Sequence, residues 1–308
     1  MNRTALLALA LFVSIPVLAQ DAVPTDQGAA ATQPVVIPPG TPPWAVSHGK
    51  ITPIHVGNAT PATPPPSGLY VAMGDSITHG GAASKSCNAF PLQPVDIEAF
   101  CPEGNSYAIL TAKALRAAGV AGRFMNLGIG GAKVERVISD ELPLLPADAT
   151  IVSLYIGTND SRGARFPGAS VSTIVSAYQK QYDNLLAAIH KQAPHARIVL
   201  LNFPNESNLP NVHDLPADSL VRLDAAAQIL DKFIDAHYPQ FPVVDLICNP
   251  ASYDAAMLSP KDGLHPTDDG HAAIAKALLD VLNAEKPAPP PAKCKWFDSS
   301  TADTLLNR

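Results

Sequence analysis

Short apolar runs alternate with stretches of helical periodicity from residue 69 to residue 285, and this alternation constrains the fold most. The apolar runs cover residues 69–73, 123–127, 150–155, 197–202 and 241–245. Between them, apolar residues recur at helical spacing, over residues 106–118, 171–191, 220–234 and 267–282. Strands that alternate with helices predict a parallel sheet that is covered by helices on both faces.

Both ends of the chain differ in composition from this alternating body. Residues 1–19 have the form of a secretory signal peptide, because a basic residue precedes an apolar run that ends in a small-residue cleavage pattern. The flanking segments hold much of the chain's proline, and such sequence favours extended conformations over a buried core. We therefore expect a Pro-rich arm over residues 20–67, one folded domain over residues 68–286 and a Pro-rich tail over residues 287–308.

Charge and hydropathy argue against nucleic-acid binding and against a membrane-spanning segment. The formal net charge is −6, whereas affinity for nucleic acids rests on clustered lysine and arginine. A membrane-spanning helix needs about 20 apolar residues, and neither the signal run nor any later run is long enough. We therefore expect no nucleic-acid partner and no integral membrane segment in the mature chain. The signal peptide predicts export to the periplasm or the extracellular space.

An even number of cysteines in an exported chain predicts disulfides. The four are Cys87, Cys101, Cys248 and Cys294, and they allow three pairings. Proximity in the sequence favours Cys87 with Cys101, which leaves Cys248 with Cys294. No C-x-x-C spacing is present, which argues against a zinc site, and we expect both bridges to be structural.

A serine at the end of the first predicted strand is the candidate nucleophile. Gly74 permits a tight turn there, and Ser76 follows it two residues later. Ligands bind at the carboxyl ends of the strands in parallel α/β sheets. Because a serine hydroxyl is a weak nucleophile until a base takes its proton, the site also needs a base and a group that orients that base.

An aspartate and a histidine near the end of the domain supply these two groups. Asp262 and His265 lie three residues apart in a predicted loop before the last helix. This spacing lets the carboxylate hold the imidazole while the other ring nitrogen faces Ser76. The sequence therefore predicts a Ser-His-Asp triad in the chain order Ser76, Asp262, His265.

Two further strand ends offer donors for an oxyanion hole, the third requirement of this chemistry. Residues 126–131 contain three glycines after the second strand and can present a backbone N–H. Asn159 follows the third strand and can present its side-chain amide. The backbone N–H of Ser76 is another possible donor.

These four motifs, in this order, resemble the conserved blocks of the SGNH (GDSL-type) hydrolase family over about residues 69–285. Residues 74–76 are similar to the first block, residues 126–131 to the second, residues 157–160 to the third and residues 262–265 to the fifth. The resemblance implies an esterase on a flavodoxin-like α/β/α sandwich with about five parallel strands.

The resemblance also implies a role for individual residues. Ser76, His265 and Asp262 would be nucleophile, base and orienting acid. Ser76, Gly131 and Asn159 would donate to the oxyanion, with Gly128 and Gly130 as alternatives to Gly131. No cofactor and no metal ion is implied.

Most of these residues also have a structural interpretation. Ser76 could cap a helix, as serine often does. Asp75 is expected to shape the turn by bonding to the backbone. Asn159 could cap the segment that follows it, although Asp160 suits that role better. Asp262 could be a turn residue only, which would leave His265 without an orienting acid.

Other histidines compete with His265 for the role of base. His79 and His213 are expected to be loop or surface residues. His271 lies near Asp268 and Asp269, which suggests a metal site, but an acidic helix N-terminus explains this group better.

The segment of residues 79–104 follows the nucleophile and contains one predicted disulfide, so it could form a rim of the substrate pocket or a surface decoration. The predicted function is hydrolysis of short-acyl esters of carbohydrates through an acyl-enzyme. A lipase or lysophospholipase, an O-acyltransferase that uses the same residues, and an inactive envelope-binding module are the alternatives.

Overall fold

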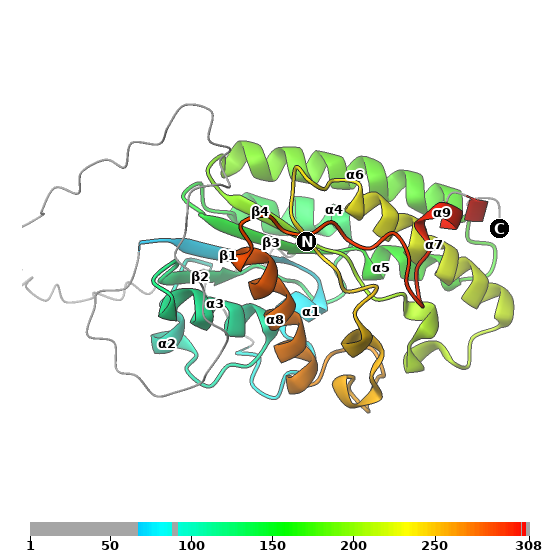
Figure 1. The fold of residues 1–308 in the computed structure, drawn as a ribbon, viewed down its shortest axis with the longest axis horizontal. Coiled ribbons are helices and arrows are strands. Elements are labelled where there is room, and N and C mark those ends of the chain that lie inside the picture. Colours follow the sequence, from blue (N-terminus) through cyan, green and yellow to red (C-terminus); the bar gives the residue numbers. More distant parts are fainter. Residues whose placement is uncertain (1–66, 88–91, 303, 306–308) are drawn as a thin grey trace, which may run out of the picture. The chain divides into compact units, whose positions relative to one another are not determined.

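A computed structural model of the chain describes residues 67–87, 92–302 and 304–305, and these contain a five-stranded parallel sheet (Figure 1). The strand order is β2-β1-β3-β4-β5, the flavodoxin-like order, and every pairing is parallel. The predicted fold class is confirmed. The strands are β1 (Leu69–Gly74), β2 (Arg123–Asn126), β3 (Ile151–Tyr155), β4 (Arg197–Leu201) and β5 (Val243–Val244).

Helices cover both faces of the sheet, and Figure 1 shows α6 above it and α3 and α8 below it. All strand residues except Arg123 are buried, as expected for strands that are covered on both sides. Thr267 caps α8 by accepting the Gly270 N–H at 3.3 Å. The long helices are α3 (Tyr107–Ala117), α6 (Val171–Gln192), α7 (Ala217–Asp235) and α8 (Asp268–Asn283), close to the predicted bounds.

Strand β5 has two residues, although the sequence predicts a run over residues 241–245. Pro242 has no N–H to donate to the sheet. The side chain of Asp245 instead accepts the N–H of Cys248 at 3.1 Å, which turns the chain away from the sheet. The short α-helices of the described residues are α1 (Ser76–His79), α2 (Ile97–Phe100), α4 (Val134–Arg136), α5 (Thr158–Ser161) and α9 (Ser299–Ala302), and 3-10 and π-helical turns connect several of the longer elements.

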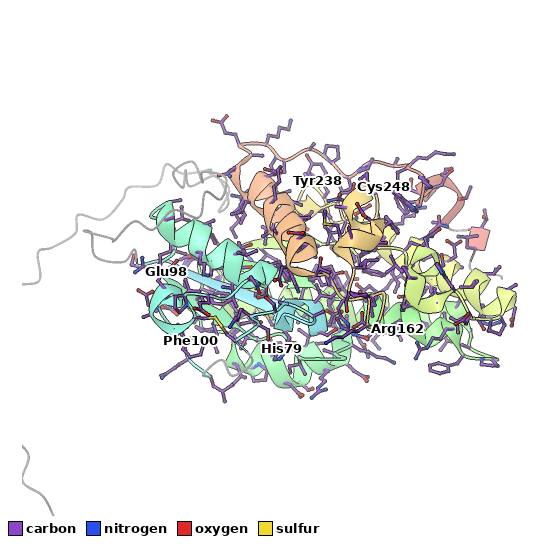
Figure 2. The ribbon with its side chains drawn as sticks, turned by 90° about the horizontal axis from the view of Figure 1, so that it is seen from below. His79, Glu98, Phe100, Arg162, Tyr238 and Cys248 are labelled. Carbon is purple, nitrogen blue, oxygen red and sulfur yellow. A yellow bond between two sulfur atoms is a disulfide. The ribbon has the colours of Figure 1, made fainter. Side chains whose placement is uncertain are left out.

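Both disulfides pair as the sequence predicts, Cys87 with Cys101 and Cys248 with Cys294. The second, at Cys248 in Figure 2, ties the loop after β5 to the tail. Packing continues past the expected boundary at residue 286, because the tail carries apolar residues after its prolines. Phe297, Ala302 and Leu305 are buried there.

The expected signal peptide and nearly all of the Pro-rich arm lie outside the described residues. Within the part of the chain that the structure describes, no helix is both long and apolar enough to cross a membrane.

Candidate active site

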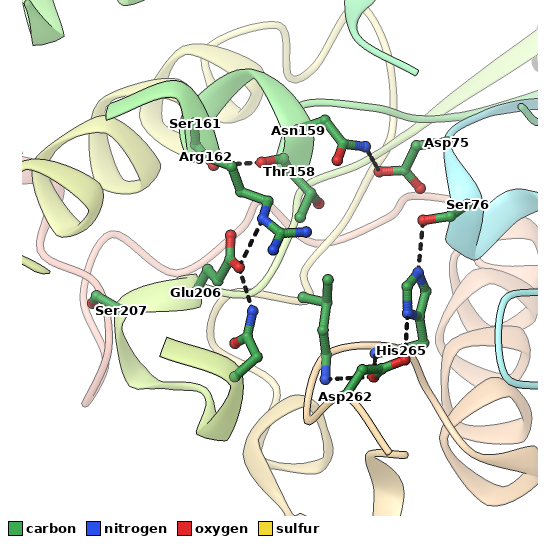
Figure 3. A network of polar contacts seen from close by, with 12 residues as sticks. Asp75, Ser76, Thr158, Asn159, Ser161, Arg162, Glu206, Ser207, Asp262 and His265 are labelled. Carbon is green, nitrogen blue, oxygen red and sulfur yellow. Dashed lines mark hydrogen bonds and ion pairs between the residues drawn. The ribbon is translucent and has the colours of Figure 1, made fainter. Parts of the chain in front are cut away.

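The candidate active site lies at the carboxyl end of β1, where His265 stands between Ser76 and Asp262 (Figure 3). The imidazole Nε2 is 2.8 Å from the Ser76 Oγ, and its Nδ1 is 2.9 Å from the Asp262 Oδ2. The structure thus brings together three residues that span 189 positions of the chain. In this arrangement the Nδ1–H donates to the carboxylate, and Nε2 accepts from the serine hydroxyl.

Asp262 serves the turn and the imidazole together, so its two interpretations are compatible. Its Oδ1 accepts the N–H groups of Leu264 at 3.0 Å and of His265 at 2.9 Å, while its Oδ2 faces the ring. Partial burial would raise the pKa of Asp262, but these N–H groups and the imidazole outweigh it and lower the pKa. The carboxyl group is therefore ionised at neutral pH, as an orienting acid must be.

A buried acid, Glu141, fixes the backbone at Gly74, where the segment that carries Ser76 begins. The Gly74 N–H donates to Oε2 of Glu141, at 2.8 Å, and Glu141 is 1 % exposed. Gly74 has a φ of 145°, which lets β1 turn abruptly into α1. Asp75, not Ser76, is the N-cap of α1, since its Oδ1 accepts the Ile77 N–H at 2.9 Å. The interpretation of Ser76 as a helix cap is therefore wrong.

Asp75 has the backbone role expected of it and is buried as well. Burial raises the pKa of Asp75 to about 7, since a carboxylate is poorly solvated there. The charge of neighbouring Asp160 raises the pKa further. Beside the candidate nucleophile there is thus an acid that is partly protonated at neutral pH.

Asn159 and Gly131 border one hollow of about 240 Å³ beside the nucleophile segment. The Asn159 side-chain amide contacts the Ala132 carbonyl at 3.0 Å and Asp75 Oδ2 at 3.4 Å, which places the amide next to the Ser76 segment (Figure 3). Gly128 is engaged elsewhere, because its N–H donates to the side chain of Asn126 at 3.0 Å.

Asp160 does not cap the segment that follows it. Its carboxyl oxygens accept the Val134 N–H at 3.3 and 3.4 Å, so it joins α5 to the start of α4. Burial raises the pKa of Asp160 to about 7. The expectation from the sequence was wrong because the partner N–H comes from a distant part of the chain.

His271 is buried near the start of α8, and both of its ring nitrogens contact the backbone. It is fully buried, its Nδ1 accepts the Tyr107 N–H at 3.3 Å, and its Nε2 lies 3.0 Å from the Gly81 carbonyl. Burial lowers the pKa of His271 to about 4, so the ring is neutral and Nε2 donates. Asp268 is engaged with Ser84, whose N–H and hydroxyl it accepts at 2.7 and 2.6 Å.

Of the other two histidines considered as the base, His79 does not lie in a loop or at the surface as expected, because it ends the same short helix that Ser76 begins. His79 is part-buried in α1, with Nδ1 3.1 Å from the carbonyl of Gly128, and His213 is exposed. Across residues 67–87, 92–302 and 304–305, no group of three or more histidine, cysteine or acidic side chains is arranged to hold a metal ion.

Gly81 touches two members of the triad, and the sequence analysis did not single it out. Its N–H donates to the Ser76 carbonyl at 2.7 Å. A Cβ at this position would lie 2.6 Å from Cδ2 of His265, so only glycine lets the imidazole sit here without a shift. The Gly80-Gly81 pair so close to the nucleophile was the available signal. Of the described residues in the expected rim over 79–104, none lines the hollow at Gly131.

A serine at a strand end, paired with a histidine and an aspartate on a parallel sheet, defines the site as that of a serine hydrolase. The sequence profile of the GDSL-like Lipase/Acylhydrolase family matches residues 72–273. The chain therefore belongs to this family of carboxylic ester hydrolases.

Several solved structures are similar to this chain at low sequence identity. Phospholipase A1 from Streptomyces albidoflavus NA297 is 23 % identical, with a TM-score of 0.50 over 71 % of this chain and 99 % of that one. An extracellular lipase from Streptomyces rimosus is 24 % identical, with a TM-score of 0.48 over 70 % and 99 %. A mutant acetyl-xylooligosaccharide esterase from Geobacillus Stearmophilus is 20 % identical, with a TM-score of 0.46 over 72 % and 98 %. No curated protein sequence matches the chain.

Proposed function

We propose that the protein hydrolyses short-acyl esters of carbohydrates, acetyl esters above all, through an acyl-enzyme on Ser76. The observation that carries the proposal is the unbroken hydrogen-bonded line from Ser76 through His265 to Asp262, with distances of 2.8 and 2.9 Å. Serine catalysis needs this contact between nucleophile and base, and a third group that orients the base.

The reaction proceeds in two halves. His265 Nε2 takes the Ser76 proton as Oγ attacks the ester carbonyl, and the N–H groups of Ser76 and Gly131 and the amide of Asn159 hold the tetrahedral oxyanion. His265 then protonates the leaving alcohol, and the acyl group stays on Ser76. Water, deprotonated by His265, attacks the acyl-enzyme and releases the acid and the free serine.

The surroundings of the triad support a short acyl group. The apolar cavity bordered by Ile77, Tyr155 and Leu264 has a volume of about 30 Å³, which is room for only about two or three water molecules. The larger hollow at Gly131 and Asn159 is lined mainly by polar and basic residues. Neither space suits a long hydrocarbon chain.

We also propose that the protein works outside the cytoplasm. Two disulfides and the absence of free cysteines among the described residues support an oxidising compartment.

Hydrolysis of p-nitrophenyl esters with two to sixteen acyl carbons, by the wild type and by Ser76→Ala, tests the proposal. We expect the activity to peak at two to four carbons and to be lost in Ser76→Ala. A peak at long chains would replace the proposal with a lipase. No hydrolysis by folded protein would overturn it in favour of acyl transfer to an acceptor alcohol or of an inactive binding module.

A further inference from the structure

Three basic side chains line the hollow that holds the proposed oxyanion donors. The hollow has a volume of about 240 Å³ and is open to solvent. It is lined by Gly131, Lys133, Asn159, Arg162, Gly163, Arg165 and Phe166, which include no acidic residue. Any part of a substrate that extends past Asn159 therefore meets positive charge.

Arg162 is held in position within this hollow by a buried acid. Its Nε lies 3.0 Å from Oε1 of Glu206, whose side chain is 1 % exposed, whereas the Arg162 side chain is 26 % exposed (Figures 2 and 3). Asn211 donates to the same carboxyl group. The ion pair with Glu206 uses Nε, so the two terminal nitrogens of the Arg162 guanidinium are left to donate to a ligand.

The other two cations are differently placed. Lys133 is exposed at the start of α4, and its charge lowers the pKa of the buried Asp160. Arg165 is half-buried, with its guanidinium carbon 5.0 Å from the ring centre of Phe166. Glu206 offsets one of the three charges and is itself harder to ionise, because burial raises its pKa. Asp75 and Asp160, whose pKa values are about 7, add partial negative charge nearby, so the three cations still outweigh the acids around the hollow at neutral pH.

This local charge opposes that of the whole chain, which is −6. A negatively charged substrate would be repelled by the molecule as a whole, and a basic hollow at the reacting centre would reverse that repulsion locally. Arginine also presents a planar pair of donors that matches a carboxylate or phosphate.

We propose that Lys133, Arg162 and Arg165 bind a negatively charged group of the substrate, and that the substrate is an acylated acidic glycan. This inference rests on the proposed function, since it names the substrate class of the same site. A carboxylate on the sugar would lie among the three cations: Arg162 offers its planar fork, and Lys133 and Arg165 supply most of the net charge, because Glu206 offsets the charge of Arg162. Phe166 is the one apolar side chain that lines the hollow, which suits a sugar better than the chains of a phospholipid.

The test compares two substrates that differ in one charge, mono-O-acetylated methyl glucuronoside and mono-O-acetylated methyl glucoside, with acetate release as the readout. For the wild type we expect kcat/KM to be about tenfold or more higher for the glucuronoside, as for a charge-assisted contact. We expect this ratio to fall about tenfold in Lys133→Gln/Arg165→Gln. Arg162→Lys, which keeps the charge next to Glu206 but lacks the planar fork, should lower the ratio by a smaller factor.

Arg136→Gln is the matched control, because Arg136 lies on the same short helix as the Lys133 cap and pairs with Asp140 at 3.1 Å outside the hollow. It should retain the wild-type ratio. Equal kcat/KM for the two sugars in the wild type would overturn the inference and leave the proposed function intact. Absence of acetate release from either sugar and from p-nitrophenyl acetate would instead reject the function itself.

A short-chain phospholipid is the third probe. If the wild type cleaves it faster than the acetylated glucuronoside, and Lys133→Gln/Arg165→Gln loses that preference, the hollow binds a lipid phosphate and the glycan assignment is overturned. If the phospholipid is the poorer substrate, the glycan assignment is supported.

Discussion

The two halves of the proposed active site are held in different ways. The nucleophile half, residues 74–78, runs from the end of the fully buried strand β1 into α1, and the Glu141 carboxyl group fixes it by accepting the Gly74 N–H. The base half, residues 259–267, is a loop that closes on itself, since the N–H of Ser259 donates to the His265 carbonyl at 2.8 Å. A small apolar cluster of Leu209, Leu258 and Leu264, separate from the main core, supports this loop.

The aspartates of the two halves, Asp75 and Asp262, also differ in burial and in pKa. Burial raises the pKa of Asp75 to about 7, whereas N–H donors and the imidazole lower the pKa of Asp262. The side chain of Asp262 is 41 % exposed, and Asp75 is 1 % exposed. The sheet thus fixes the proposed nucleophile as part of the fold, whereas local hydrogen bonds fix the proposed base. Changes in the base half should therefore affect activity more than stability, and changes in the nucleophile half should affect both.

Loss of either Ser76 or His265 should lower activity most, and to a similar extent. Ser76→Ala and His265→Ala should each lower kcat on p-nitrophenyl acetate by about 10⁴- to 10⁶-fold, since each removes a partner that the reaction requires. Thermal unfolding followed by circular dichroism should show a folded protein in both cases. A variant that retains a tenth of wild-type activity would contradict the assigned roles.

Asp262→Asn should lower kcat by about 10²- to 10⁴-fold, because an amide no longer holds the imidazole in the required tautomer. The amide oxygen can still accept the N–H groups of Leu264 and His265, so we expect the Tm to change little. Asp254→Asn is a suitable control, since Asp254 caps a neighbouring turn through the Ala256 N–H without contacting the triad. Loss of activity that is explained wholly by unfolding would refute the orienting role.

Leu264→Ala tests whether the small cluster positions the base. We expect kcat to fall about 10- to 100-fold as the loop loosens, because small displacements of a catalytic group are costly. The Tm should fall less than for a truncation in the main core, such as Leu154→Ala beneath the same site. If Leu264→Ala lowers Tm as much as Leu154→Ala and leaves kcat unchanged, the proposed difference between the halves is wrong.

Glu141→Leu probes the nucleophile half, where it would leave the buried Gly74 N–H without an acceptor. We expect the free energy of unfolding to fall by about 1–3 kcal/mol, measured by urea denaturation. Glu141→Gln retains an acceptor oxygen and should lose less. Equal losses in the two variants would mean that the contact at Gly74 does not stabilise the strand end.

The smallest expected effect is on the pH dependence of stability. Because the pKa of Asp75 is about 7 in the native state and about 3.9 in an unfolded chain, the native state binds more protons between these values. The contribution of Asp75 to stability is therefore complete below about pH 4 and is lost as the pH rises to about 7.

Asp75→Asn should therefore make the decrease in Tm between pH 4 and pH 7 less steep. Asp160 and Asp235, whose pKa values burial also raises to about 7, retain their own contributions, and His271 acts in the opposite direction. Asp262→Asn should leave this window unchanged, because the pKa of Asp262 is lowered. A variant Asp75→Asn with the wild-type slope would show that Asp75 is not the buried titrating group.

The two halves were predicted from the sequence in different ways. Alternation of apolar runs was sufficient to place β1, β3 and Ser76, because strands buried on both sides leave a clear pattern. Asp262 and His265 were found by their spacing and by family resemblance, since a loop has no periodicity. Strands and helices with a regular apolar pattern were therefore predicted well. Strand β5 is the exception, because Pro242 shortens it.

Contacts between distant segments were missed. Glu141 stands before an apolar run and was not singled out from the sequence, yet it accepts the N–H of Gly74, 67 positions earlier. His271 was interpreted as part of an acidic helix N-terminus, yet its ring contacts the Gly81 carbonyl across 190 positions. The burial of Phe297 was not predicted, because the prolines of its segment indicate an extended tail. No local pattern encodes such contacts, because each depends on how the completed sheet brings its ends together.

Mapping of a covalent adduct would identify the nucleophile. The protein would be treated with a p-nitrophenyl alkylphosphonate, digested and analysed by peptide mass spectrometry. We expect one phosphonyl group on Ser76, no labelling in Ser76→Ala and much slower labelling in His265→Ala. A folded wild-type protein that stays unlabelled, or carries the group on another residue, would contradict the claim that Ser76 is the nucleophile.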